Sequence, residues 1–396
     1  MIKSIQLTHF TAVSALGYGL DAHYQALMTE QGALRPCDYQ TAKINTYIGR
    51  VSGLENQIWP SEWLSYYSRN NLLALMALQQ DNMLNAIQEA KNRYGAKRIG
   101  LLLGTTTSGF SEAERAYQQR GVDGQLPKDF DYQKTAHPFA SCEFLRNYLD
   151  LQGPAMTIAT ACSSSAKAFI SAQRWLQLNL CDAVLIAGID SLCLNILYGF
   201  NSLGILSPEV CRPFDQNRTG LSLGEAAALV LVERVDSEGI GLLGFGESTD
   251  GHHMSAPHPE GKGAYLAMQA ALATAGLMPN EIDYINFHGT ASLQNDVIED
   301  QAVYQLFSDQ VPASSTKGWM GHVLGAAGAL EVVIACLAIQ HKMLWATLNT
   351  EKIDKNVRSN ILLKNKSSVV KKALINSFGF GGNNCSLIIG ELNNEN

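Results

Sequence analysis

Apolar runs that alternate with helical stretches constrain the fold of this chain more than any other feature. The runs are apolar throughout, which is typical of strands covered by helices on both faces. The strand-like runs lie at 99–103, 183–187, 226–232, 284–287 and 386–389, and the helical stretches lie at 71–94, 164–178, 263–275 and 325–339. We therefore predict an α/β protein built in layers, with the runs as buried parallel strands.

The same local pattern occurs once in each half of the chain. A strand, a turn dense in small residues and a helix are expected around TIATACSSSAKAF at 157–169 and again around SSTKGWMGHVLGAAGA at 314–329. A length of 396 residues suits two domains or one duplicated fold. We expect a duplicated fold that divides near residue 250, into halves at 1–250 and 251–396.

Composition narrows the classes of function. Hydrophobic residues make up 46% of the chain and charged residues 16%, which is sufficient for a large core. The net charge of −7 argues against nucleic acid as a partner. The stretch at 321–339 is the nearest to a membrane span, but it carries His322 and Glu331, so we expect a buried helix instead. The C-terminal NNEN is expected to be frayed.

The cysteines indicate a reducing compartment. The chain has eight cysteines, and none of them forms a C-x-x-C pair. This spacing favours neither a zinc site nor a disulfide framework, and we expect a cytoplasmic protein without a metal.

Cys162 is the first candidate for chemistry. It follows an apolar run and precedes SSSAKAF, so a strand-to-helix turn is expected to place its sulfur at a helix N-terminus. The helix dipole there favours a thiolate, and backbone N–H groups at the same point can hold an oxyanion. A buried structural cysteine is the alternative that this motif alone leaves open.

Two histidines and a glycine loop are the other candidates. His288 follows an apolar run in YINFHGTASLQND, at the carboxyl end of a strand where α/β proteins bind ligands. His322 opens a helix rich in glycine, and FGFGG at 378–382 permits a tight turn whose N–H groups face a site. Helix capping and an ordinary β-turn are the alternatives. GIGLLG at 239–244 matches a dinucleotide motif, but no helix is expected after it, so we reject that interpretation.

Together these segments resemble the β-ketoacyl-[acyl carrier protein] synthases of the thiolase superfamily, of the elongating Cys–His–His type. TACSSS resembles the nucleophile motif, HGTASLQND the HGT motif, and STKGWMGHVLGAAGALE the segment with lysine, histidine and glutamate. CRPFDQNRTGLSLGEAA and NSFGFGGNN resemble two further signatures. The resemblance spans about residues 95–390 and implies a thiolase-like fold, a duplicated five-layer αβαβα architecture.

The resemblance also implies a decarboxylating Claisen condensation. Cys162 would hold an acyl group as a thioester, and the N–H groups of Cys162 and Phe380 would bind the oxyanion. His288 and His322 would hydrogen-bond the carbonyl of a malonyl thioester, so that carbon dioxide leaves and the carbanion attacks. No cofactor is needed, because both substrates would arrive on the phosphopantetheine arm of acyl carrier protein.

Further residues take supporting roles by resemblance. Lys317 and Glu331 would form a buried pair near His322, and Asp296 and Glu299 would orient the loop that carries His288. Phe380 would act as a mobile gate between glycines. The residues expected to bind the substrate and its arm are Thr290, Ser292, Phe200 and Gly381. The small residues of GTTTSG at 104–109 are expected to line an acyl channel that admits long or rigid chains.

Departures from the family pattern leave the substrate open. Ser292 stands where a threonine is usual, Asn383 replaces a threonine in the glycine loop, and HFTAVSALGYG lacks the usual glycine-rich opening. A specialised polyketide or aryl polyene pathway is therefore open beside fatty-acid synthesis. Two other functions stay open: a partner subunit that is not itself catalytic, and a thiolase or cysteine hydrolase with Cys385 as a second cysteine.

The expected partners are acyl carrier protein and a second subunit. Because the carrier is acidic and this chain is also net negative, docking requires a local basic patch. Arg69, Lys128 and Arg212 are the candidates by resemblance. The second subunit would be an identical chain or a homologue that resembles a chain-length factor.

Overall fold

The computed structural model describes residues 4–234 and 238–392, and the C-terminal NNEN lies outside them. Most of the strands belong to a single 12-stranded sheet, in which β1 and β10 are antiparallel neighbours. The principal strands of the first half are β1 (Ile5–Ser14), β5 (Ile99–Gly104), β6 (Ala155–Ile158), β7 (Ala183–Asp190) and β9 (Ala226–Arg234). Those of the second half are β10 (Gly239–Thr249), β11 (Tyr284–Asn286), β12 (Pro312–Ser314), β16 (Lys372–Gly379) and β17 (Asn383–Leu392).

The strand order repeats, as a duplicated fold requires. The first half runs β6-β5-β7-β9-β1, and the second half runs β12-β11-β16-β17-β10. Equivalent pairs also share direction: β5–β7 and β11–β16 are parallel, whereas β7–β9 and β16–β17 are antiparallel. The second copy of this order starts with β10, upstream of the division expected near residue 250.

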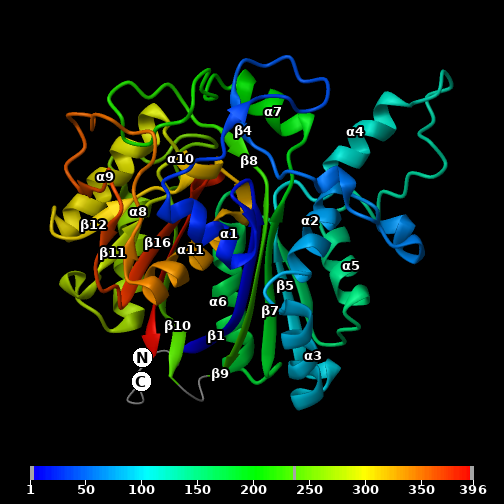
Figure 1. The fold of residues 1–396 in the computed structure, drawn as a ribbon, viewed down its shortest axis with the longest axis horizontal. Coiled ribbons are helices and arrows are strands. Elements are labelled where there is room, and N and C mark those ends of the chain that lie inside the picture. Colours follow the sequence, from blue (N-terminus) through cyan, green and yellow to red (C-terminus); the bar gives the residue numbers. More distant parts are fainter. Residues whose placement is uncertain (1–3, 235–237, 393–396) are drawn as a thin grey trace.

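Helices cover both faces of each half and also fill the space between the halves. One outer layer is α2 (Arg69–Leu78), α3 (Met83–Tyr94) and α5 (Ala140–Tyr148), and the other is α8 (Lys262–Ala275) and α9 (Leu293–Phe307). The central layer is α6 (Ser164–Gln177) with α11 (Ala327–His341). Figure 1 shows the layers side by side, from α3 and α5 on the right to α8 and α9 on the left. The five-layer thiolase-like architecture is thus confirmed.

The alternation of side chains between the two faces of each strand explains the layered packing. Leu101 and Leu103 pack with the outer helices α2, α3 and α5, whereas Leu102 between them packs with the central helices. Successive strand side chains point to opposite faces, so a strand covered on both faces must be apolar at every position. The prediction of buried strands from uniformly apolar runs is therefore confirmed.

Two details of the sequence prediction were wrong. β9 and β17 are antiparallel to both of their neighbours, because an apolar run reports burial on two faces and says nothing of direction. The stretch at 71–94 forms two helices rather than one. Asp81 and Asn82 take positive φ angles of 46° and 60° at the break, where the Asp81 carboxylate accepts a hydrogen bond from the Thr11 hydroxyl at 2.6 Å.

The remaining elements are short or lie around the rim. GIGLLG at 239–244 lies inside β10, which continues to Thr249, so the rejection of a dinucleotide turn agrees with the structure. Among the described residues, one helical segment, Leu324–His341, is long and apolar enough to cross a membrane, but 89% of it is buried in the core. The other elements are β2 (Gly17–Tyr18), α1 (Gly19–Met28), β3 (Arg35–Pro36), β4 (Tyr47–Gly49), α4 (Phe110–Gln118), α7 (Leu194–Ser202), β8 (Leu223–Gly224), α10 (Lys317–Met320), β13 (Met343–Leu344), β14 (Asn360–Ile361) and β15 (Lys366–Ser367).

Candidate active site

Cys162 lies in the turn between β6 and α6, as the sequence predicts. The turn is sharp because Ala161 takes a positive φ of 53°, and Ser163 is the N-cap residue of α6. Residue 162 therefore precedes the first turn of a helix whose axis passes through the central layer. Cys162 is only 5% exposed, and what surrounds its sulfur comes largely from the other half of the chain.

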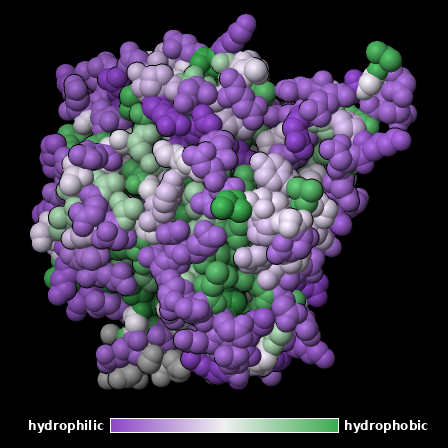
Figure 2. Space-filling view, turned by 45° about the vertical axis from the view of Figure 1, so that its right-hand side comes forward, coloured by the Kyte–Doolittle hydropathy of each residue, from purple (hydrophilic) through white to green (hydrophobic). Residues whose placement is uncertain are grey.

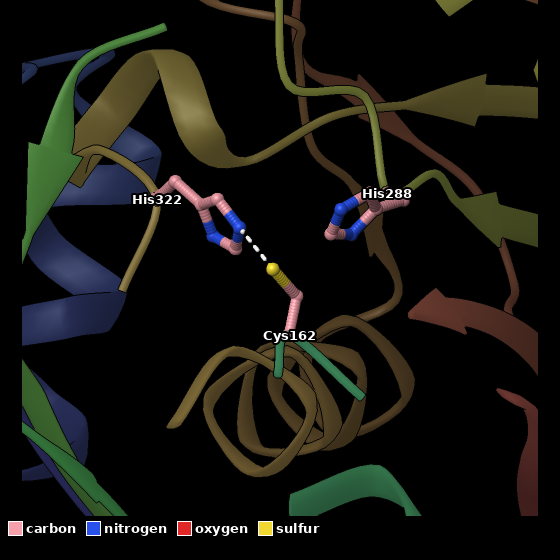
Figure 3. Close-up of side chains that lie close together, drawn as sticks. All are labelled: Cys162, His288 and His322. Carbon is pink, nitrogen blue, oxygen red and sulfur yellow. Dashed lines mark hydrogen bonds between the residues drawn. The ribbon is translucent and has the colours of Figure 1, made fainter. Parts of the chain in front are cut away.

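Two histidines from the second half of the chain lie beside the Cys162 sulfur. His288 follows β11, and His322 follows α10. The His322 Nε2 atom lies 2.9 Å from the Cys162 Sγ atom, and the two imidazole rings are nearly perpendicular with centroids 5.2 Å apart. Figure 3 shows both rings directed at the sulfur from opposite sides. The fold thus joins three side chains that are far apart in the sequence.

The backbone around His322 is fixed by the first half of the chain. The His322 amide donates to the Ser222 carbonyl at 2.8 Å, and the Gly224 amide donates to the His322 carbonyl at 2.9 Å. His322 therefore forms a parallel β-bridge with Leu223 of β8. CRPFDQNRTGLSLGEAA (211–227) contains this strand, which gives that signature a structural reason.

A carboxylate pair holds the loop that carries His288. Glu299 on α9 accepts the amides of His288 and Gly289 at 2.7 and 2.8 Å, and Asp296 accepts the Ala291 amide at 3.1 Å. Both carboxylates are buried. The predicted orienting contacts are therefore present in the structure.

Lys317 and Glu331 form a buried ion pair beside the histidines. The Nζ atom lies 2.5 Å from Oε1, and both side chains are 3% exposed. The pair joins α10 to α11, as the sequence suggested.

Removal of one partner of this pair is expected to be costly. Lys317→Ala leaves the Glu331 carboxylate buried without a cation, and we expect it to lower the free energy of unfolding by about 3–5 kcal/mol. The matched double variant Lys317→Met with Glu331→Leu removes both charges at similar volume and should recover most of this loss. Chemical denaturation followed by circular dichroism measures both variants. Equal stabilities of the single and double variants would contradict the pairing.

Burial and Lys317 set the protonation of the site. Burial, and secondly the positive charge of Lys317, hold the pKa values of His288 and His322 well below the usual value, so both rings are neutral near pH 7. Burial raises the pKa of Cys162 to about 11, against the opposing effects of Lys317 and of the Phe380 and Cys162 backbone amides. The resting site is therefore a neutral thiol beside neutral imidazoles, and the thiol must lose its proton to His322 to react.

The glycine loop closes the site. Phe380 lies between Gly379 and Gly381, and its ring stacks on Phe200 with centroids 5.5 Å apart. Gly381 has a φ of 79°, which a residue with a side chain rarely adopts. The Gly381 amide donates to the Met254 carbonyl, so the loop rests on a second loop at the mouth.

A cavity of about 480 Å³ leads from this loop to the sulfur. It is mostly apolar, and the substrate-binding residues predicted from the sequence lie on its wall. They are Thr290, Ser292, Phe200 and Gly381, beside Cys162, His288, His322 and Phe380. Its size suits an extended, flexible arm such as phosphopantetheine.

Asp250 is one of the residues of the cavity wall that sequence reasoning missed. Its amide donates to the Gly382 carbonyl at 2.9 Å, and its carboxylate accepts from the Asn384 side chain at 2.9 Å. Asp250 thereby ties the glycine loop to the loop at 250–258. The signal was a polar segment, DGHHMSAPHP, that follows a long apolar strand.

The structure corrects two further expectations. Arg69 is buried and its guanidinium is paired with Glu225 at 2.6 Å, so it cannot take part in carrier docking. Lys128 is exposed, and Arg212 is partly exposed and paired with Glu209. The hydroxyls of Thr105 and Thr107 donate to Asp190 instead of lining a channel.

The three side chains also suit a metal ion by spacing alone. One donor atom from each of Cys162, His288 and His322 lies within 4.8 Å of the others. The charge of Lys317 acts on both rings, and a dication beside it would be repelled. The site is better matched to a neutral thioester and to negative charge that develops on its oxygen.

The fold and this site define a thiolase-like enzyme of the acyltransferase class. Residues 68–238 match the family Beta-ketoacyl synthase, N-terminal domain, and residues 241–351 match Beta-ketoacyl synthase, C-terminal domain. This chain belongs to the β-ketoacyl synthase family.

Two similar proteins span the whole chain. It is 38% identical to 3-oxoacyl-[acyl-carrier-protein] synthase 2 of Rhizobium meliloti, with 98% of this chain and 99% of that protein covered. A solved ketosynthase, ApeO in complex with its chain length factor ApeC from Xenorhabdus doucetiae, is 38% identical with a TM-score of 0.91, and 98% of each chain is covered. The mitochondrial 3-oxoacyl-[acyl-carrier-protein] synthase of Arabidopsis thaliana is 37% identical over 61% of this chain and 57% of that protein.

Proposed function

We propose that this chain is a condensing enzyme that joins an acyl group to malonyl-acyl carrier protein, with loss of carbon dioxide, to give 3-oxoacyl-acyl carrier protein. The observation that carries the proposal is the contact of 2.9 Å between His322 Nε2 and Cys162 Sγ, with His288 beside both. Family membership and the synthases among its relatives support the same reaction.

The first half-reaction loads the enzyme. The Cys162 sulfur attacks the thioester carbonyl of an acyl carrier protein while its proton passes to the His322 Nε2 atom. The tetrahedral oxyanion is held by the amides of Cys162 and Phe380, both of which already act on the thiol in the resting site. When the intermediate collapses, the thiol of the arm leaves with the proton from His322.

The second half-reaction makes the carbon–carbon bond. The malonyl carboxylate leaves as carbon dioxide, and its electron pair forms an enolate whose oxygen accepts hydrogen bonds from His288 and His322. Neutral rings suit this task because each carries one N–H group. His322 accepts a proton at Nε2 in the first half-reaction and donates in the second as the tautomer with its proton on Nε2. The enolate carbon attacks the acyl-Cys162 carbonyl, and Cys162 leaves as a thiolate that takes a proton from water. Every catalytic group in this reaction is a residue of this chain, with water as the final proton source, and we propose that the enzyme uses no cofactor.

The supporting residues act through these groups. Burial, and secondly the charge of Lys317, keeps the two rings neutral, and Asp296 and Glu299 keep the loop of His288 in place. Thr290 and Ser292 offer hydroxyls to the amide groups of the arm. Phe380 opens and closes the entrance, since its stacking on Phe200 is the contact that must break. Lys128 and Arg212 remain the proposed contacts for acyl carrier protein.

We propose a second subunit at the end of the sheet where β6 lies. Among the described strands β6 pairs only with β5, which leaves one edge open, and Met156 on this strand is 38% exposed. An open edge with apolar side chains fits pairing with an identical or homologous chain. The β6 edge is proposed from its strand pairing and the exposure of Met156; the face drawn in Figure 2 is largely hydrophilic, with some apolar surface at its centre. ApeO, which is paired with a chain length factor, favours a heterodimer.

We place the enzyme in the cytoplasm, because all eight cysteines are free thiols. A pathway of polyketide or polyene type is the second candidate beside fatty-acid synthesis, and the similarity to ApeO favours it.

Mass spectrometry of the purified chain tests the reaction. We expect acyl carrier protein to transfer its acyl group to the enzyme, and malonyl carrier protein then to release carbon dioxide and form the 3-oxoacyl product. A parallel sample contains the chain-length-factor homologue. Activity only in that sample identifies an obligate heterodimer, and acylation in neither sample would refute the proposal.

A further inference from the structure

Asp190 is a buried carboxylate that has no role in the proposed reaction. It ends β7 and is fully inaccessible to solvent. Its Oδ1 atom accepts the hydroxyls of Thr105 and Thr107 at 2.7 and 2.8 Å and the amides of Thr106 and Thr107 at 2.8 and 2.7 Å. Among the residues that the structure describes, no ion pair to this carboxylate is found. Burial of a negative charge that is hydrogen-bonded only to neutral donors costs free energy, so we expect Asp190 to have a functional role.

The second oxygen of Asp190 reaches across the chain to the other half. Its Oδ2 atom accepts the Gly325 amide at 2.6 Å and the Thr106 amide at 3.0 Å. Gly325 lies three residues after His322, at the end of a turn in which Leu324 has a φ of 54°. β8 holds the start of this turn through His322, and Asp190 holds its end.

The contact leaves no room for a side chain at position 325. A Cβ atom there would lie 2.8 Å from the Asp190 Oδ2 atom and 2.9 Å from the Thr106 Oγ1 atom. The turn and the carboxylate therefore fit together closely, and a small shift at Gly325 moves the segment that carries His322.

We propose that Asp190 is the positioning residue of His322: it binds the Gly325 amide and so fixes the turn that presents the imidazole to Cys162. This inference rests on the proposed function for its catalytic consequence, and none of the sequence motifs pointed to Asp190. The threonines of GTTTSG form the cradle that keeps the carboxylate in place.

The charge of Asp190 gives the role a second readout. It raises the pKa of Cys162, whereas Lys317 lowers it, and His288 and His322 are neutral. These are the charged and titratable groups that face the thiol. Loss of the Asp190 charge is therefore expected to lower the pKa of Cys162, which a role in stability alone would not do.

Asp190→Asn and Gly325→Ala separate the two effects. In Asp190→Asn the amide oxygen can still accept from the threonines, but its NH₂ group then faces the Gly325 amide. We expect kcat for condensation to fall about 10- to 100-fold with little change in KM, by analogy with the loss of groups that orient metal ligands. The pH profile of Cys162 alkylation by iodoacetamide should shift to lower pH.

Gly325→Ala pushes the turn away from Asp190 and keeps the charge. We expect a similar loss of kcat, slower alkylation at pH 7 because the thiol loses its proton acceptor, and a thiol pKa that stays near the wild-type value. Thr350→Val is the control for stability, because it removes another buried hydrogen bond between the halves, from the Thr350 hydroxyl to the Pro213 carbonyl at 2.6 Å, without a change of charge. Its alkylation profile should not shift.

Several outcomes would overturn the proposal. Either variant with a wild-type kcat does so, as does a loss of kcat in Asp190→Asn with an unshifted alkylation profile. If Asp190→Asn does not fold, Gly325→Ala decides alone, with circular dichroism to show that it is folded. Alkylation needs no acyl substrate, so an enzyme without condensing activity still tests the placement of His322, and the two failures remain distinct.

Discussion

Replacement of Cys162 with alanine is expected to abolish acyl transfer to the enzyme and to lower condensation by at least ~10³-fold. No other side chain at the site can hold the acyl group, because His288 and His322 are needed as neutral donors. Release of carbon dioxide from malonyl carrier protein should persist, since the histidines remain. Intact-mass spectrometry of the enzyme and a carbon dioxide assay measure the two steps separately.

Cys385→Ala is the matched control for this variant. Cys385 is fully buried in β17, and burial raises its pKa, so it is expected to be a packing residue. The control should be acylated as the wild type is. A labelled Cys162→Ala protein, or an inactive Cys385→Ala protein, would instead favour a thiolase with two catalytic cysteines.

Loss of either histidine is expected to slow malonyl decarboxylation by about 10²–10³-fold, because each imidazole donates to an oxygen that gains charge in the transition state. His288→Ala and His322→Ala should differ in the first half-reaction. Only His322 contacts the Cys162 sulfur, so only His322→Ala should also slow acyl transfer. Rapid-quench assays with acyl and malonyl carrier proteins measure the two half-reactions.

His341→Ala controls for the loss of an imidazole elsewhere. His341 ends α11, is exposed, and stacks on Tyr24, away from the cavity. It should retain wild-type rates in both half-reactions. The double variant of His288 and His322 should lose less than the product of the two single losses, because both act on one oxygen. Equal effects of His288→Ala and His322→Ala on acyl transfer would contradict the assignment.

The sequence predicted three side chains that the structure brings together at the candidate site. Cys162, His288 and His322 each lie in a motif with a local reason: a strand-to-helix turn, the end of a strand, and a glycine-rich helix start. Uniformly apolar runs likewise predicted strands buried on both faces, since that property depends on local composition. Lys317 and Glu331 were predicted as a pair by resemblance to the family, and pairing offsets the cost of a buried charge.

How these residues come together depends on the tertiary structure and could not be predicted from the sequence. The direction of β9 and β17, the burial of Arg69 against Glu225 and the role of the GTTTSG threonines depend on contacts between segments far apart in the chain. The contact between Asp190 and Gly325 joins residues 135 positions apart and has no local signal in the sequence. Local pattern therefore determined which groups perform the chemistry, and packing of the two halves determined which groups hold them in position.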